Sequence, residues 1–111
     1  GDGGFGQLGH GDSQDQRQPK KIDALADRRV VAASAGAVHS LAITADGGVW
    51  SWGGGDYGKL GHGDSQNQLL PKKIEALADL RVVAVSAGAV HNLALTADGG
   101  VWSWGGGIFV R

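Results

Sequence analysis

Apolar residues occur in short runs broken by small and polar residues, which is the pattern of β-strands rather than helices. The runs HSLAIT (39–44) and VWSW (49–52) are rich in β-branched, aliphatic and aromatic residues, and Ala-Asp-Gly-Gly separates them. An Asp-Gly turn between two such runs is a strong signal for a β-hairpin. Before them, RVVAASAG (29–36) predicts another strand that ends at a glycine. Residues 19–26 carry apolar positions at helical spacing but are too few to predict a helix.

The whole pattern recurs along the chain. A shift of 52 residues superposes 1–52 on 53–104 without a gap, and 40 of the 52 pairs are identical. The shared segments include LGHGDSQ, PKKI, SAGAVH and TADGGVWSWG. We therefore divide the chain into two repeats, 1–52 and 53–104, followed by the truncated start of a third, 105–111.

The period and the predicted elements together indicate a fold class. A period of this length is typical of solenoids, propellers and similar arrays. Each repeat offers three or four strands and no convincing helix, which excludes the helical repeats. The chain is predicted to be all-β, with each repeat forming a small antiparallel sheet like one blade of a β-propeller.

Composition excludes several classes of function. The 111 residues carry a formal net charge of -1, so nothing favours nucleic acid or an anionic membrane as an obligatory partner. No residue is cysteine, which excludes disulfides and Cys-ligated zinc and leaves the redox compartment open. No apolar run approaches the ~20 residues of a membrane span. We expect a soluble, intracellular protein.

The motifs resemble those of a known repeat. WGGGDYGKLGHGD (52–64), followed by a proline and then by VVAVSAGAVHNLALTADGGVWSWG (82–105), is similar to the RCC1 repeat, named for the regulator of chromosome condensation. The resemblance covers essentially the whole chain and implies β-propeller blades, here two four-stranded antiparallel blades per chain. It leaves function open, because such propellers serve as guanine-nucleotide exchange factors, ultraviolet photoreceptors, chromatin readers, ubiquitin-ligase substrate domains and protein inhibitors.

A glycine motif of the kind that binds nucleotides occurs in each repeat. Gly53, Gly55 and Gly58 give the spacing GxGxxG, and the first repeat has the same spacing at its start. A dinucleotide site requires a helix directly after these glycines. The next residues contain two more glycines and a proline, so we interpret the motif as turns and close backbone approach between blades. No cofactor is expected.

Two further patterns contain residue types of catalytic or metal sites. His62 and Asp64 form an HxD pair, repeated at positions 10 and 12, but metal sites need three or four converging ligands, so a loop-closing hydrogen bond is favoured. Ser34, His39 and Asp46 have the residue types of a hydrolytic triad, yet Asp46 lies in the predicted hairpin turn. We predict no catalytic residue, no metal and no enzyme.

The resemblance also bears on which branch of the family the chain follows. Its light-sensing branch reads GWRH where this chain has alanine and valine before His39 and His91, which argues against light sensing. In the nucleotide-exchange branch, the polar residues for the GTPase partner come from that same loop and from the position after WGxG. Only Asp56 of this chain matches that pattern well, which argues against exchange activity. Possible loop-face binding residues are Asp56, Tyr57, Lys59 and Asn92. The residues expected to build the repeat itself are Gly53, Gly55, Gly58, Gly61, Gly88, His39, His91, Trp50, Trp52, Trp102 and Trp104.

Two blades leave open faces and edges, which suggests assembly. The second repeat is the more apolar, and Leu69, Leu70 and Leu80 are possible inter-chain contacts. If the blades of one chain pack by an interface that both share, the same interface can join copies of the chain into a cyclic homo-oligomer. Three copies would give six blades and four would give eight. We predict a self-assembling protein-binding scaffold; the alternative is a piece of a longer RCC1-like regulator acting on a small GTPase or on chromatin, since the chain lacks an initiator methionine.

Overall fold

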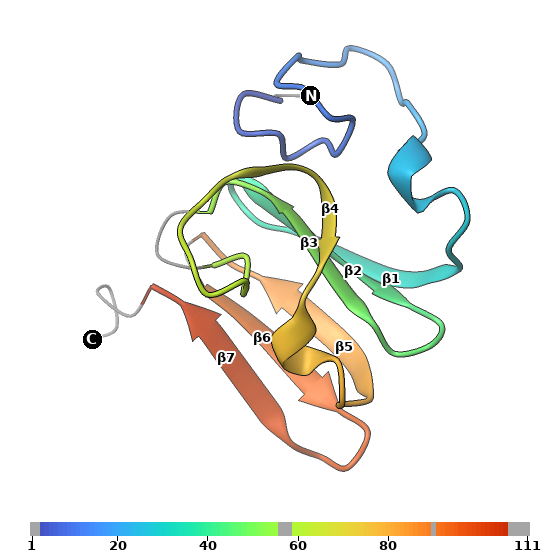
Figure 1. Cartoon of the computed structure of the whole chain (residues 1–111), viewed down its shortest axis with the longest axis vertical. Helices are drawn as coiled ribbons and strands as arrows, with labels where there is room; N and C mark the ends of the chain where they lie inside the picture. The colour runs from blue at the N-terminus through green and yellow to red at the C-terminus, as the bar shows by residue number, and fades with distance from the viewer. Residues whose placement is uncertain (1–2, 56–58, 90, 107–111) are drawn as a thin grey trace.

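The computed structural model describes residues 3–55, 59–89 and 91–106, which form two antiparallel sheets (Figure 1). The sheets have the strand orders β1-β2-β3-β4 and β5-β6-β7. This confirms the all-β prediction. The first sheet contains β1 (Val30–Ala35), β2 (His39–Thr44), β3 (Val49–Gly53) and β4 (Gln68–Lys73). The second contains β5 (Val82–Ala87), β6 (His91–Thr96) and β7 (Val101–Gly105).

The hairpins form where the Asp-Gly turns predict them. In the first sheet, one carboxylate oxygen of Asp46 accepts hydrogen bonds from the Thr44 hydroxyl at 2.6 Å and from the Gly48 amide at 3.1 Å. These bonds favour the charged carboxylate and lower the pKa of Asp46, and the pKa of Asp98 in the second hairpin is lowered in the same way. The Asp of each turn is therefore a hairpin cap.

The fourth strand crosses the repeat boundary. β4 comes from the second repeat and pairs with β3 of the first, with Trp50 opposite Lys73 and Ser51 opposite Lys72. The prediction of two four-stranded blades is therefore right for the first sheet, whereas the second has three strands among the described residues. Residues 16–21, the counterpart of β4 in the first repeat, are not a strand, because the described part of the chain offers them no strand like β3 to pair with.

Helical structure is minor. The marginal helical signal at 19–26 corresponds to the 3-10 helix η1 (Asp23–Leu25), and the second repeat has its counterpart η3 (Glu75–Leu77). Each buries one leucine, Leu25 in η1 and Leu77 in η3, in a hydrophobic cluster. Within the described ranges, no helix is long and apolar enough to cross a membrane.

The core lies between the two sheets. Both β1 and β2 contact β5, so one face of the first sheet covers the opposite face of the second (Figure 1). Because side chains alternate along a strand, each sheet has two distinct faces. The residues buried together between the sheets are Leu41, Ile43, Val49, Ile74, Leu77, Val82 and Ala94. Burial of these aliphatic side chains is what holds one sheet on the other.

Candidate functional site

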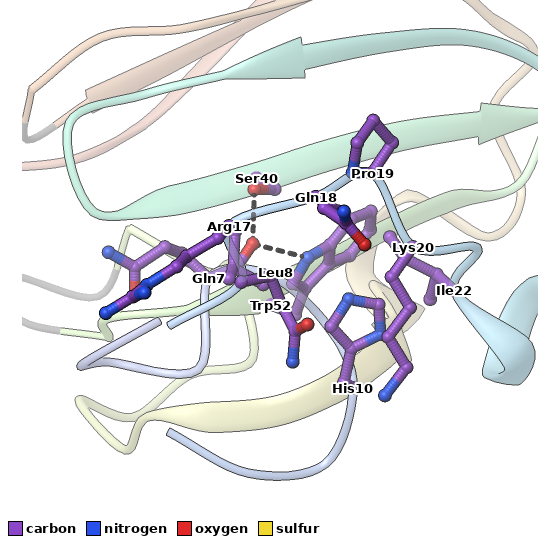
Figure 2. A pocket seen from close by; sticks show the side chains of 11 residues that line it. Gln7, Leu8, His10, Arg17, Gln18, Pro19, Lys20, Ile22, Ser40 and Trp52 are labelled. Carbon is purple, nitrogen blue, oxygen red and sulfur yellow. Dashed lines mark hydrogen bonds between the residues drawn. The ribbon is translucent and has the colours of Figure 1, made fainter. Parts of the chain in front are cut away.

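Each repeat contains a clamp in which two side chains hold one loop carbonyl. In the first repeat, the Ser40 hydroxyl and the Trp52 indole both donate to the Gln7 carbonyl, each at 2.9 Å (Figure 2). In the second repeat, Trp104 donates to the Lys59 carbonyl at 3.0 Å and the Asn92 side-chain amide donates to the same oxygen. Two donors on one loop carbonyl fix the glycine-rich loop against its sheet.

Asn92 also joins the two sheets. Its Oδ1 accepts a hydrogen bond at 2.6 Å from Nε2 of His39, which lies on β2 of the first sheet. The acceptor assigns the proton of His39 to Nε2, and the other ring nitrogen, Nδ1, is buried with no partner among the described residues. A second contact runs from the Ala87 amide to the Ser34 hydroxyl at 3.0 Å. The interface between the two sheets, which we call the joint, therefore combines the apolar core with the His39–Asn92 and Ser34–Ala87 hydrogen bonds.

The joint holds His39 in its neutral form. Burial lowers the pKa of His39, the hydrogen bond with Asn92 raises it, and the positive charge of Lys59 lowers it further, with burial the largest effect. Burial likewise lowers the pKa of His62, with the Lys72 charge adding to it. Protonation of His39 would add a donor at Nδ1, where the described part of the chain offers no acceptor.

This environment predicts that acid weakens the fold before any carboxylate titrates. The unfolded chain has an ordinary histidine pKa of about 6.5, so as the pH falls from about 7.5 to about 5 the unfolded state binds more protons than the folded state. The free energy of unfolding should therefore decrease over this interval. Urea titrations at several pH values measure it. The His39→Gln variant, which keeps a donor for Asn92, should show a shallower decrease, and an equal slope in both proteins would contradict this account of His39.

The HxD pairs close loops. Nε2 of His62 lies 3.0 Å from the Ser51 hydroxyl, which donates to the Leu60 carbonyl at 2.7 Å. Oδ1 of Asp64 accepts from the Gln66 amide at 3.1 Å, and Asp12 makes the same bond in the first repeat. These are the loop-closing bonds that the sequence favours. Among the described residues no three His, Asp or Glu side chains converge on a possible metal site.

The residues of the possible triad are engaged separately. Ser34 accepts the amide of Ala87, His39 bonds Asn92, and Asp46 caps its hairpin. Each side chain is already used by a structural contact, and no nucleophile–base pair results.

The GxGxxG glycines allow close backbone approach. At Gly55, a Cβ atom would lie 2.0 Å from the Gln66 carbonyl oxygen, and Gly53 adopts a φ of +105° against the Val38 carbonyl. Strand β3 ends at the first of these glycines, and the residues described after it contain no helix start before β4. The motif is thus a close-packed turn at Gly53 and Gly55, and the close approach is to Val38 and Gln66 rather than across to the other sheet. Gly58 lies outside the described residues.

The predicted loop-face residues do not form an exposed cluster in the described structure. Asp56 and Tyr57 lie outside the described residues. Lys59 is 3% exposed and Asn92 is 0% exposed, so neither side chain is available on the surface. The expectation for Lys59 and Asn92 is therefore wrong. The Lys59 carbonyl and the Asn92 side chain form the clamp, and Asn92 also bonds His39 across the sheets. Sequence reasoning missed this role, although Asn92 replaces Ser40 at one of the few positions where the repeats differ.

The remaining predicted residues divide into buried and open sites. Trp52 is buried, Trp50 stacks under the Arg28 guanidinium at 4.8 Å, and Trp102 is exposed. Gly61 and Gly88 lie against the side chains of Trp104 and His91, respectively. Of the three leucines predicted at an interface, Leu80 packs on the core, while Leu69 and Leu70 lie partly exposed beside Gly6 and Gly11 of the first repeat.

Equivalent residues of the two repeats differ sharply in exposure. Leu41 and Val49 are 0% and 1% exposed because the second sheet covers them, whereas their counterparts Leu93 and Val101 are 43% and 69% exposed. Leu95, which lies opposite Val101 on the same face, is 41% exposed as well. The second sheet therefore presents to solvent the same face that the first sheet uses as its joint.

A cavity lies on the first repeat, away from the exposed face of the second sheet. It has a volume of about 480 Å³ and lies beside the clamp of the first repeat, between the loop carrying Leu8 and His10 and the segment carrying Gln18 and Lys20 (Figure 2). In the second repeat, the corresponding loop and β4 have β3 between them, since Ser51 contacts Leu60 and His62 and pairs with Lys72. The cavity is thus the place that a strand fills in the other repeat.

Comparison with known proteins gives a consistent result. The sequence pattern of the protein family described as the regulator of chromosome condensation (RCC1) repeat matches residues 1–43 and 46–95. The chain is 48% identical over 113 residues to the human E3 ubiquitin-protein ligase HERC2 and 45% identical over 107 residues to the ultraviolet-B receptor UVR8 of Arabidopsis thaliana. These alignments cover 100% and 96% of this chain but 2% and 24% of the relatives.

A solved structure gives the same picture in three dimensions. The structure of Prp20p from Saccharomyces cerevisiae, a protein described by its binding to Gsp1p and histones, superposes with a TM-score of 0.83 and 30% identity. The match covers 95% of this chain and 27% of that one.

Proposed function

This chain belongs to the family of RCC1 repeats, and from that premise we propose that it is a non-enzymatic module that assembles with copies of itself into a closed β-propeller scaffold for protein binding. Propeller blades are stable when each sheet is covered by the next. One chain supplies a single covered joint and leaves two sheet faces uncovered, so neighbouring copies complete the arrangement.

The exposed face of the second sheet carries this proposal. Leu93 and Val101 occupy the repeat positions of Leu41 and Val49, which are core residues of the joint within the chain. The complementary face, on the far side of the first sheet, carries Val30, which is 40% exposed and is the counterpart of the core residue Val82. Each copy thus offers both halves of the joint, one at each end.

Such a joint is heterologous, so it produces a ring when the rotation closes. Two blades per chain give six blades for three chains and eight blades for four. The ring would hold the glycine-rich loops on one side, and the loop around Asp56 and Tyr57 is the proposed contact for a protein partner. Prp20p, which shares the fold, is described by its binding to proteins, and this supports a protein rather than a small molecule as the partner.

Sedimentation velocity tests assembly through this face. The wild-type chain should sediment as a particle several times heavier than one 11.3 kDa chain. The Val101→Lys variant should sediment as a folded single chain, because Val101 is exposed in one chain and a lysine ammonium resists burial in an apolar joint. A wild-type chain that stays at 11.3 kDa at every concentration would overturn the proposal.

The second candidate is a part of a larger RCC1-like regulator, because the chain spans about a quarter or less of the relatives it matches. A regulator of this kind acts on a small GTPase or on chromatin. Release of a fluorescent guanine nucleotide from a small GTPase separates the two: an exchange factor accelerates release, and a scaffold leaves the rate unchanged.

A further inference from the structure

We propose that residues 16–21 of a second copy of this chain add to the outer edge of β7 as its fourth strand, and that β7 in turn fills the cavity of Figure 2 in that copy. The inference rests on the proposed self-assembly and deepens it. The ring is then joined by backbone hydrogen bonds between copies as well as by apolar faces.

Both members of a pairing seen within the chain occur a second time. Strand β7 has the same sequence as β3, VWSWG. Residues 16–21, QRQPKK, share four of six positions with β4, QLLPKK. In the described structure β3 and β4 pair with each other, whereas β7 is an edge strand and 16–21 is not a strand. A donor strand and an open edge of matching sequence are therefore both present.

The pairing within the chain fixes the register between copies. Trp50 lies opposite Lys73 and Ser51 opposite Lys72, and the Ile74 amide donates to the Val49 carbonyl at 2.7 Å. The same register places Trp102 opposite Lys21 and Ser103 opposite Lys20 of the second copy. The amide of Ile22 would then donate to the carbonyl of Val101.

The cavity accepts the strand at the expected place. In the second repeat, the Ser51 hydroxyl on β3 donates to the Leu60 carbonyl and lies within reach of His62. The equivalent residues of the first repeat, Leu8 and His10, line the cavity together with Lys20. Ser103 is exposed in the single chain and would occupy this cavity beside Leu8 and His10 of the second copy.

Two glycines of the second repeat face open space, whereas their counterparts in the first repeat contact a neighbouring residue. A Cβ atom on Gly11 would meet the Leu70 side chain at 3.3 Å, but one on Gly63, the counterpart of Gly11, would meet nothing within 4 Å. Likewise Gly47 faces Arg81, and its counterpart Gly99 faces open space. The space at both glycines is where the first repeat of a following copy would lie.

A second copy fits this edge better than an unrelated peptide. Exposed strand edges pair readily with another strand, and the partner is selected by side-chain fit. Here the match extends beyond one strand to the loop around His10 and to the exposed Val30 on the far face of the first sheet. These features come together on the first repeat of this chain.

Disulfide trapping between singly substituted chains tests the pairing. The protein contains no cysteine, so Lys20→Cys and Ser103→Cys each carry one thiol. Directly opposed residues on antiparallel strands have Cα atoms about 4.5–5.5 Å apart, which a disulfide can span. Mixed and mildly oxidised, the two chains should shift on a non-reducing gel from the mass of one chain to that of two.

The controls separate this inference from self-assembly itself. Each chain alone, and Ser103→Cys mixed with Ser13→Cys, should stay at the mass of one chain, because those positions are not opposed. If sedimentation shows the wild type assembled but Lys20→Cys and Ser103→Cys do not link, the strand pairing is wrong while the scaffold stands. If the wild type remains a single chain, both are wrong.

Discussion

Replacing Leu41 by alanine is expected to lower the free energy of unfolding by about 2–5 kcal/mol, the usual cost of removing a fully buried leucine side chain. Leu41 is 0% exposed and belongs to the core between the sheets. Its loss leaves a cavity that Ile43 and Val82 cannot fill without moving. Urea unfolding followed by tryptophan fluorescence measures the change.

The matched control is Leu93→Ala, at the equivalent position of the second repeat. Both substitutions are made in the Val101→Lys background, so that a single chain unfolds in each case. Leu93 is exposed there, and its truncation should cost less than about 1 kcal/mol. Equal losses at the two positions would contradict the assignment of the joint to one face of each sheet.

Replacing Asn92 by alanine is expected to cost about 2–4 kcal/mol, because two buried partners lose their hydrogen bonds at once. Nε2 of His39 loses its acceptor, and the Lys59 carbonyl loses one of its two donors. Since His39 lies on the first sheet, the change also removes a polar bridge across the joint. The same urea assay in the same background measures it.

Asn92→Ser provides the finer comparison. Serine stands at this position in the first repeat, where Ser40 donates to the Gln7 carbonyl. The serine variant should keep the bond to the Lys59 carbonyl and lose only that to His39, so its loss should be clearly smaller. If serine and alanine destabilise equally, the clamp on the Lys59 carbonyl contributes nothing.

The local pattern predicts the strands that pair with their sequence neighbours. β2 and β3 coincide with HSLAIT and VWSW, and β1 falls within RVVAASAG, because short apolar runs and Asp-Gly turns encode hairpins directly. The repeat then carries the same elements into the second half. Propeller architecture follows from the period and the lack of helices.

Strand β4 could not be predicted in the same way. Its sequence, QLLPKK, contains a proline, which weakens a strand prediction, and it becomes a strand only because β3 lies beside it. Residues 16–21, which share four of the six positions, have no such neighbour among the described residues and are not a strand. Tertiary pairing, not local sequence, decides the difference.

The burial of Asn92 and Lys59 could not be predicted from the sequence either. A polar residue at a position that differs between the repeats is ordinarily taken as a surface residue. Burial of Asn92 follows from the approach of β2 of the first sheet to β6 of the second, which brings His39 within 2.6 Å. The difference between Ser40 and Asn92 is visible in the sequence, but no sequence pattern indicates how closely the two sheets approach each other.

Native mass spectrometry of the wild-type chain tests the central claim most directly, namely that the two ends of each chain are halves of one joint. A closed ring predicts one dominant species of three or four chains of 11.3 kDa, with the Val101→Lys variant reduced to one chain. A wild-type spectrum containing only single chains, or an open series of every size without a dominant closed species, would contradict it.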